Sequence, residues 1–115
     1  MAFARMNRLE VAPGISLWPA ALEARAQASL IEDVFVRAAA APFYRPAMPG
    51  SGKPFSVEET NFGPLGWFSD RAGYRYERCH PRTHETWPEI PPLLLELWDA
   101  VTDMAPAPER LCRAG

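Results

Sequence analysis

Cysteine and histidine are scarce in this chain, which contains two of each. The two cysteines, Cys79 and Cys112, are too few for the disulfide framework of a small secreted domain, and free thiols favour a reducing compartment. Long apolar runs are absent as well, and none approaches the ~20 apolar residues that a membrane-spanning helix needs. The first residues have no continuous apolar core, which argues against a secretory signal. We therefore expect a cytoplasmic protein with no membrane partner.

The chain also has little excess charge, but that charge is unevenly distributed. The formal net charge of −2 is made up of 0 over residues 1–44, +2 over residues 45–82 and −4 over residues 83–115. A nucleic-acid-binding protein usually has a basic patch, because phosphate contacts supply most of its sequence-independent affinity. Only the middle third is a candidate for such a patch. Ordinary solvated charge explains the same numbers.

The length suits a single small domain, residues 1–115, and the sequence shows no internal repeat. Its start reads as extended, with a turn at Pro13–Gly14. Apolar residues then recur at helical spacing in two segments. The first predicted helix covers residues 19–41, with Pro19 at its start, and the second covers residues 92–104.

Two short segments between these helices alternate apolar and polar residues, as strands do. We predict that residues 55–60 and 73–77 pair as a ribbon, with residues 61–72 as its connection. Tyr74 and Tyr76 then share one face of the ribbon, and charged residues take the other. The predicted fold class is α+β, with two helices plus a short β-ribbon. Because no closed sheet is predicted, we expect the chain to be part of a larger domain.

Residues 60–76, TNFGPLGWFSDRAGYRY, combine glycines with an unusual number of aromatic residues. One interpretation is a nucleic-acid site, since a ring can stack on a nucleobase and glycines allow close backbone approach. That interpretation uses Trp67 to stack on a base, and it uses four residues to hold the backbone: Tyr74, Tyr76, Arg71 and Arg75. The other interpretation is a small core filled by Trp67, Phe62 and Phe68.

Several motifs follow one another in the middle of the chain: MPG at 48–50, SVEETNFGPLGW at 56–67, DRAGYRY at 70–76, HPRT at 80–83 and WPEIP at 87–91. In this order and spacing they resemble the N-terminal part of AlkB. AlkB is the DNA-dealkylation enzyme of the Fe(II)/2-oxoglutarate dioxygenase superfamily. The resemblance extends over about residues 11–108.

The resemblance implies a nucleotide-recognition lid at about residues 45–90 of a double-stranded β-helix (jelly-roll) dioxygenase. By position, Trp67 matches the ring that stacks on the damaged base. Tyr74 matches a tyrosine that contacts DNA phosphate, and Tyr76 matches one that borders the base pocket. Arg71 and Arg75 stay candidate phosphate contacts. The implied partner is alkylated single- or double-stranded DNA, with RNA as an alternative.

The resemblance also shows what this chain lacks. Enzymes of the superfamily hold Fe(II) with a His-x-Asp pair and a distant His, and they bind 2-oxoglutarate. Neither His80 nor His84 is followed two residues later by Asp. We therefore expect a truncated AlkB-like protein without its catalytic barrel, with no catalytic residue, no metal ligand and no cofactor of its own. Two positions also depart from the family, which can have Thr at Met48 and a base-lining Met at Glu59.

Two other sites are conceivable around the histidines. Cys79, His80 and His84 have a ligand-like spacing, but Pro81 prevents a regular helix there and no second cysteine pair follows, which favours incidental spacing. Adjacent Cys79 and His80 seldom reach the geometry of a catalytic dyad. A non-catalytic module that binds single-stranded nucleic acid, or an inactive fragment, stays the alternative function. We expect a monomer.

Overall fold

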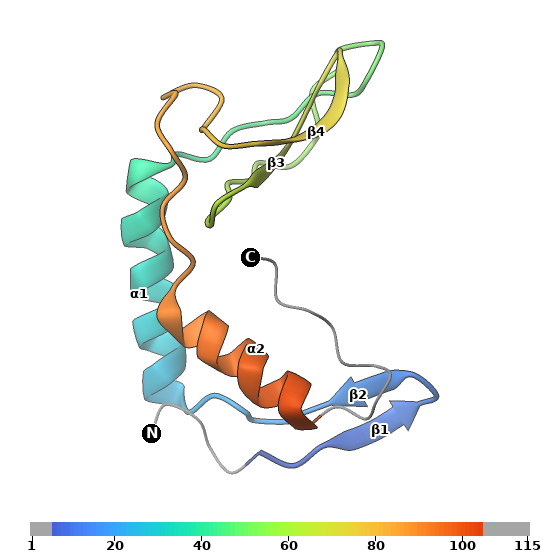
Figure 1. The fold of residues 1–115 in the computed structure, drawn as a ribbon, viewed down its shortest axis with the longest axis vertical. Helices are drawn as coiled ribbons and strands as arrows, with labels where there is room; N and C mark the ends of the chain where they lie inside the picture. Colours follow the sequence, from blue (N-terminus) through green and yellow to red (C-terminus); the bar gives the residue numbers. More distant parts are fainter. Residues whose placement is uncertain (1–5, 105–115) are drawn as a thin grey trace. The chain divides into compact units, whose positions relative to one another are not determined.

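The computed structural model describes residues 6–104, which form two helices and two small antiparallel sheets (Figure 1). The elements follow one another as β1 (Leu9–Ala12), β2 (Ile15–Leu17), α1 (Ala24–Ala40), β3 (Gly66–Asp70), β4 (Gly73–Glu77) and α2 (Pro92–Met104). The chain divides into two compact units. One comprises the described residues up to Asp33 and from Pro91 onward, and the other is Val34–Ile90. This composition is compatible with the predicted α+β class.

The first unit contains the β1–β2 hairpin, in which Leu9 pairs with Leu17. Its turn lies at Pro13–Gly14, as predicted, and Gly14 has a φ of 79° that suits glycine. The predicted second helix is confirmed as α2, which begins at Pro92. Proline suits this first helical position, because its missing N–H would have no partner inside the helix. No helix within residues 6–104 is long and apolar enough to cross a membrane.

The predicted first helix begins later than expected, at Ala24 instead of Pro19. Ala20 has a φ of 52°, which is left-handed backbone and interrupts a helix. The first helical hydrogen bond runs from the Gln27 N–H to the Glu23 carbonyl at 2.9 Å. The helix ends at Ala40, two residues before Pro42, which lacks the N–H needed to continue it.

The second unit has a small aromatic core. Tyr44 and Trp87 are buried together with Ala41, and Phe68 packs against them. His80, which is 1% exposed, meets the Tyr44 ring edge-on with the two ring centres 5.3 Å apart. A geometry of this kind is favourable for aromatic rings. The core therefore joins residues that lie at the beginning, middle and end of the unit.

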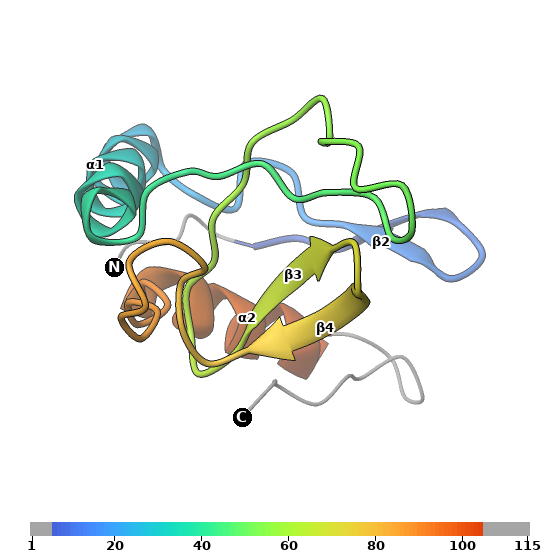
Figure 2. The same ribbon diagram turned by 90° about the horizontal axis from the view of Figure 1, so that it is seen from above.

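The predicted ribbon is wrong in one of its strands. Residues 73–77 form β4, but their partner is β3 at 66–70 and not residues 55–60 (Figure 2). The connection is the two-residue turn Arg71–Ala72 in place of a long loop. Residues 55–60 instead run beside the start of the unit, where Glu59 forms an isolated bridge with Tyr44.

Candidate nucleic-acid interface

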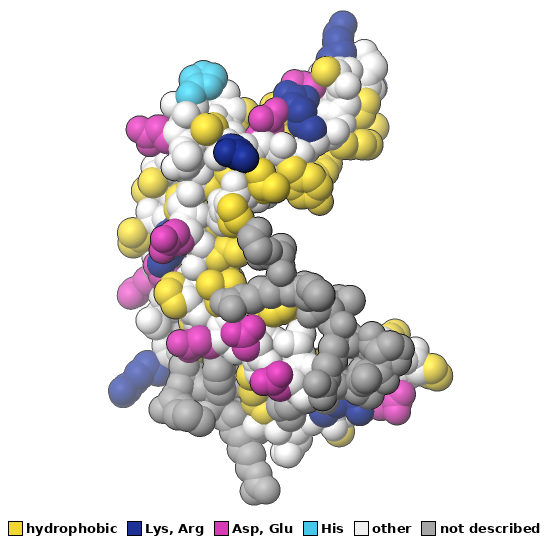
Figure 3. Space-filling view, in the orientation of Figure 1, with side chains coloured by type: hydrophobic (Ala, Val, Ile, Leu, Met, Phe, Trp, Pro, Cys, Tyr) yellow, Lys and Arg dark blue, Asp and Glu magenta, His cyan; other side chains and the backbone are white. Residues whose placement is uncertain are grey.

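The β3–β4 hairpin has two chemically different faces, because successive residues of a strand point to opposite sides. Trp67 pairs with Tyr76, and Ser69 pairs with Tyr74, so the three rings share one face. Arg75 lies on the other face, as predicted for the charged residues of β4. Figure 3 shows hydrophobic side chains gathered on one side of this region and charged side chains on the other.

The aromatic face is a partly open platform of rings. Trp67 and Tyr74 stack with their ring centres 5.7 Å apart and their planes 27° apart, and Phe55 lies 6.0 Å from Trp67. Tyr74 is 61% exposed and Tyr76 is 69% exposed. Of the rings named for a small core, Phe68 alone is found packed against the buried cluster of Ala41, Tyr44 and Trp87. Phe68 belongs to the core, whereas the half-buried Trp67 lies with the tyrosines.

The backbone of Trp67 is held by two side chains. Asn61 accepts from the Trp67 N–H at 3.3 Å and donates to its carbonyl at 3.1 Å, while the Tyr44 hydroxyl donates to the same carbonyl at 2.9 Å. Burial and the nearby Glu59 carboxyl raise the pKa of Tyr44 to about 12. The sequence analysis gave neither Asn61 nor Tyr44 a role. The signal for Asn61 was its place in the motif that also contains Trp67.

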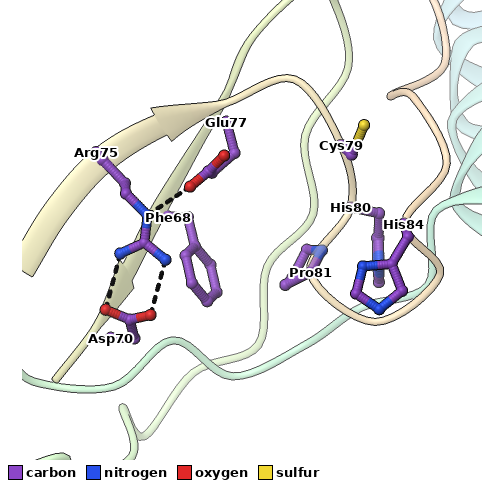
Figure 4. A pocket seen from close by; sticks show the side chains of 8 residues that line it. All are labelled: Phe68, Asp70, Arg75, Glu77, Cys79, His80, Pro81 and His84. Atoms are coloured by element: carbon purple, nitrogen blue, oxygen red, sulfur yellow. Dashed lines mark hydrogen bonds and ion pairs between the residues drawn. The ribbon is translucent and has the colours of Figure 1, made fainter. Parts of the chain in front are cut away.

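Arg75 organises the opposite face. Its guanidinium donates to both carboxylate oxygens of Asp70, at 2.8 and 2.7 Å, and also to Glu77 (Figure 4). It lies 4.9 Å from the centre of the Phe68 ring, within range of a cation–π interaction. The hydrogen bonds from Arg75 lower the pKa of Asp70 to about 2. A cavity of about 380 Å³ lies between this network and residues 79–84.

The two arginines predicted to contact phosphate are held differently. Arg71, in the hairpin turn, donates to the Ser51 carbonyl at 3.0 Å, and its own carbonyl accepts from Gly50 at 3.0 Å. It is exposed. Arg75 contacts two carboxylates and would have to leave them to bind an anion. The turn arginine is thus better placed for a phosphate than Arg75.

Both ring nitrogens of His80 form hydrogen bonds within the fold. Its Nε2 lies 2.7 Å from the Pro42 carbonyl oxygen, and its Nδ1 accepts from the N–H groups of Arg82 at 3.0 Å and Thr83 at 3.1 Å. A carbonyl oxygen only accepts, so Nε2 carries the proton. His84 is exposed, with a φ of 62°. The His80 imidazole therefore links residues 80–83 to Pro42 through hydrogen bonds.

The described residues do not fit an Fe(II) centre. Both ring nitrogens of His80 are hydrogen-bonded already, and within residues 6–104 no group of three or more His, Cys, Asp or Glu side chains is placed to hold a metal ion. The hairpin exposes the rings and hydroxyl groups of Tyr74 and Tyr76, and its turn exposes the Arg71 guanidinium.

Comparison with known proteins agrees with the resemblance to AlkB. A family model described as the 2OG-Fe(II) oxygenase superfamily matches residues 14–111. An alpha-ketoglutarate-dependent dioxygenase AlkB homolog of Caulobacter vibrioides is 47% identical over 103 residues, which cover 88% of this chain and 46% of that protein. The alpha-ketoglutarate-dependent dioxygenase AlkB of Salmonella typhimurium is 43% identical over 67 residues, covering 58% of this chain and 31% of its own length.

The AlkB of Escherichia coli is 42% identical over 62 residues, which cover 54% of this chain and 28% of that protein. The chain thus spans about half the length of the Caulobacter relative and less of the other two. The match with the family model nevertheless covers most of this chain. The chain therefore belongs to the 2OG-Fe(II) oxygenase superfamily and is AlkB-like within it.

Proposed function

We propose that residues 45–90 form a nucleotide-recognition lid, the part of an AlkB-like enzyme that grips a flipped-out alkylated base during oxidative dealkylation of DNA. The observation that carries this proposal is the stacked pair of Trp67 and Tyr74, with the exposed Tyr76 on the same face. The similarity to proteins named as AlkB dioxygenases supports it.

The role of the rings follows from the energetics of base extraction. Taking a base out of the duplex costs a few kcal/mol, and less when the base is damaged and poorly paired. Stacking on an aromatic side chain returns about 1–3 kcal/mol per base. In this proposal Trp67 stacks on the base, Tyr74 contacts a DNA phosphate and Tyr76 borders the base pocket. Arg71 is the better-placed phosphate ligand, and the same role for Arg75 stays a prediction.

The surrounding contacts suit such a platform because they fix its backbone before any ligand arrives. Asn61 and Tyr44 hold the Trp67 peptide groups, and Asp70 accepts from the Ala72 N–H in the hairpin turn at 2.9 Å. A platform that is ordered in advance loses less conformational entropy on binding. The proposed rings therefore stand on a rigid hairpin and not on a loose loop.

The proposal assigns recognition, and not the oxidation, to this chain. In a full-length member of the superfamily Fe(II) and 2-oxoglutarate supply the oxidising chemistry. The described residues form two two-stranded sheets and do not fit an iron centre. We propose that residues 6–104 do not form the catalytic barrel. Alkylated DNA is the proposed partner, with RNA as the alternative, and the cytoplasmic location and monomeric state stay predictions.

Replacing Trp67 tests the proposal. Binding of the 115-residue chain to a fluorescent single-stranded oligonucleotide with one methylated base is measured by anisotropy. Trp67→Ala should weaken binding about 5- to 100-fold, the loss of one stacked base, while Trp67→Phe keeps most of the affinity. Phe43→Ala is the matched control, because Phe43 is an exposed aromatic residue outside the hairpin. Equal binding by Trp67→Ala and wild type would show that the stacking role is wrong.

A further inference from the structure

A second, smaller cavity of about 280 Å³ is lined by Phe68 and by two arginines. Arg45 comes from the segment that follows α1, and Arg82 comes from the segment that follows β4. Phe68 and Pro81 line both this cavity and the larger one of about 380 Å³. The two cavities are therefore neighbours, and both lie away from the ring platform of Trp67.

The charged side chains around the two cavities have opposite balances. The larger cavity has Asp70 and Glu77 against Arg75, which already bonds to both carboxylates (Figure 4). The smaller cavity has two arginines against one carboxylate, that of Glu58. One carboxylate neutralises at most one guanidinium, so the smaller cavity keeps a positive charge that can attract an anion.

Backbone carbonyls hold both guanidinium groups of the smaller cavity in place without neutralising them. Arg82 donates to the Phe43 carbonyl at 2.7 Å, and Arg45 donates to the Phe55 carbonyl at 3.1 Å. A guanidinium has five N–H donors, so each of these hydrogen bonds leaves most of the donors for another partner. Because the side chains are positioned in advance, an anion that binds them costs less conformational entropy.

Glu58 is a weak competitor for this anion. Its Oε1 lies 4.0 Å from the Arg45 Nε, which is beyond hydrogen-bond distance, and both side chains are about half exposed. Exposed ion pairs of this kind contribute little to stability, whereas hydrogen bonds of normal length between a guanidinium and an anion are strong. An anion that contacts both arginines can therefore displace Glu58.

Two guanidinium groups at one cavity favour phosphate over a carboxylate as the ligand. A single guanidinium fork satisfies the two oxygens of a carboxylate, whereas a phosphate group has further oxygens for a second fork. The volume also suits a small group, since cavities that enclose drug-sized ligands measure about 300–1,000 Å³. We propose that the cavity between Arg45 and Arg82 is a phosphate-binding site.

The phosphate can come from the backbone of a nucleic-acid strand or from a free phosphate group. The first source rests on the proposed lid function, because the strand would be the one whose base the lid grips. The site itself rests only on the two arginines and their anchors. It is separate from the phosphate contacts proposed at Tyr74 and Arg71, which belong to the ring platform and the hairpin turn.

Titration of the 115-residue chain with inorganic phosphate tests the site directly. Phosphate replaces chloride at constant ionic strength, and NMR follows the arginine Nε–H resonances. Those of Arg45 and Arg82 should shift along one saturating curve, whereas that of Arg78, which is exposed and outside the cavity, should not. Unsaturated shifts that are equal at all three arginines would show general screening by salt and would overturn the proposal.

Three variants assign the binding to named side chains. Arg82→Gln, followed through Arg45, should weaken phosphate binding by about tenfold or more. Arg45→Gln, followed through Arg82, should do the same, so a folding defect in one variant does not decide the test. Glu58→Gln should strengthen binding by up to about fivefold, because it removes the competing carboxylate. Unchanged affinity in both arginine variants would contradict the site.

A single-stranded oligonucleotide without a methylated base identifies the source of the phosphate. If a strand supplies it, Arg82→Gln should lower the slope of log K against log salt by about 0.7, while Arg78→Gln keeps the slope. Saturating phosphate shifts with an unchanged slope would assign the site to a free phosphate group. No phosphate binding and no change of slope would overturn the proposal. Trp67→Ala should bind inorganic phosphate as wild type does, so failure of the lid proposal would not remove this site.

Discussion

The guanidinium of Arg75 reaches across the hairpin turn to both carboxylate oxygens of Asp70, at 2.8 and 2.7 Å. Arg75 also contacts Glu77 and lies against the Phe68 ring. The positive charge of Arg75 is therefore neutralised within the hairpin. Arg71, two residues from β4 in the turn, is exposed and donates to a neutral carbonyl. Two arginines that look alike in the sequence thus differ in the partners that surround them.

This difference gives a prediction about salt dependence. In single-stranded oligonucleotide binding, Arg71→Gln should lower the slope of log K against log salt by about 0.7, the value for one lost phosphate contact. Arg75→Gln should leave the slope unchanged and lower the midpoint of thermal unfolding. Binding isotherms at several salt concentrations give the slopes, and Arg78→Gln serves as an exposed control. If Arg75→Gln also lowers the slope, the prediction that Arg75 contacts a phosphate is supported.

The close packing of Gly66 on Trp87 gives a second prediction. A Cβ atom at Gly66 would lie 2.3 Å from the Trp87 indole, which is buried and donates to the Glu77 carbonyl at 2.8 Å. Gly66→Ala should therefore lower the free energy of unfolding by about 3 kcal/mol. Gly50→Ala, where a Cβ meets nothing within 4 Å but φ is 77°, should cost about 1 kcal/mol. Chemical denaturation measures both, and equal losses would contradict the packing argument.

The two histidines should respond differently to the same substitution. His80→Ala leaves the Pro42 carbonyl and two N–H groups without their partner and creates a cavity, so it should cost about 3 kcal/mol of stability. His84→Ala removes an exposed side chain and should change stability by less than about 0.5 kcal/mol. Denaturant unfolding of both variants is the measurement. If His80→Ala is as stable as wild type, the hydrogen bonds of His80 do not stabilise the fold.

The pKa shifts of two carboxyl groups predict opposite effects of pH on stability. The pKa of Glu59 is raised above 4.5 in the folded state, so its contribution is full below that pH and is lost as pH rises through the raised pKa. The pKa of Asp70 is lowered from 3.8 to about 2, so its contribution is present above pH 3.8 and is lost as pH falls toward 2.

Thermal unfolding of two variants across this pH range separates these contributions. Wild type should lose stability as the pH increases above 4.5, and Glu59→Gln should not show this loss. Wild type should also lose stability as the pH decreases below 3.8, and Asp70→Asn should show a smaller loss. Each variant thus serves as the control for the other. Identical pH profiles for wild type and Glu59→Gln would contradict the burial of that carboxyl.

Much of the fold was predictable because helices and simple turns leave local signals. The turn at Pro13–Gly14 and the helix that begins at Pro92 follow from residues with restricted or permissive backbones. Strand β3 was missed because Trp67 and Phe68 are both apolar, so the segment shows no alternation. The structure explains this, since one ring faces the platform and the other faces the core.

The hairpin turn had a signal that the sequence analysis did not use. Asp70 accepts from the N–H two residues later, as aspartate does in tight turns, and Gly73 follows with a φ of 125°. For the candidate site, the shared face of Tyr74 and Tyr76 was predicted from strand alternation alone. The hydrogen bond from Tyr44 to the Trp67 backbone was not predicted, because Tyr44 lies 23 residues away in sequence and only tertiary packing brings its hydroxyl there.

The alternation of the β3–β4 hairpin also bears on how such a protein can change over time. Substitutions at outward-facing positions such as Tyr74 and Tyr76 alter the surface offered to a ligand and leave the Phe68 side in place. Insertion or deletion of a single residue in either strand has the opposite effect, because it exchanges the faces of every residue beyond it. Under the proposed function, point mutations at this hairpin can therefore change which ligand it recognises, whereas the length of its strands is constrained by the core that Phe68 packs against.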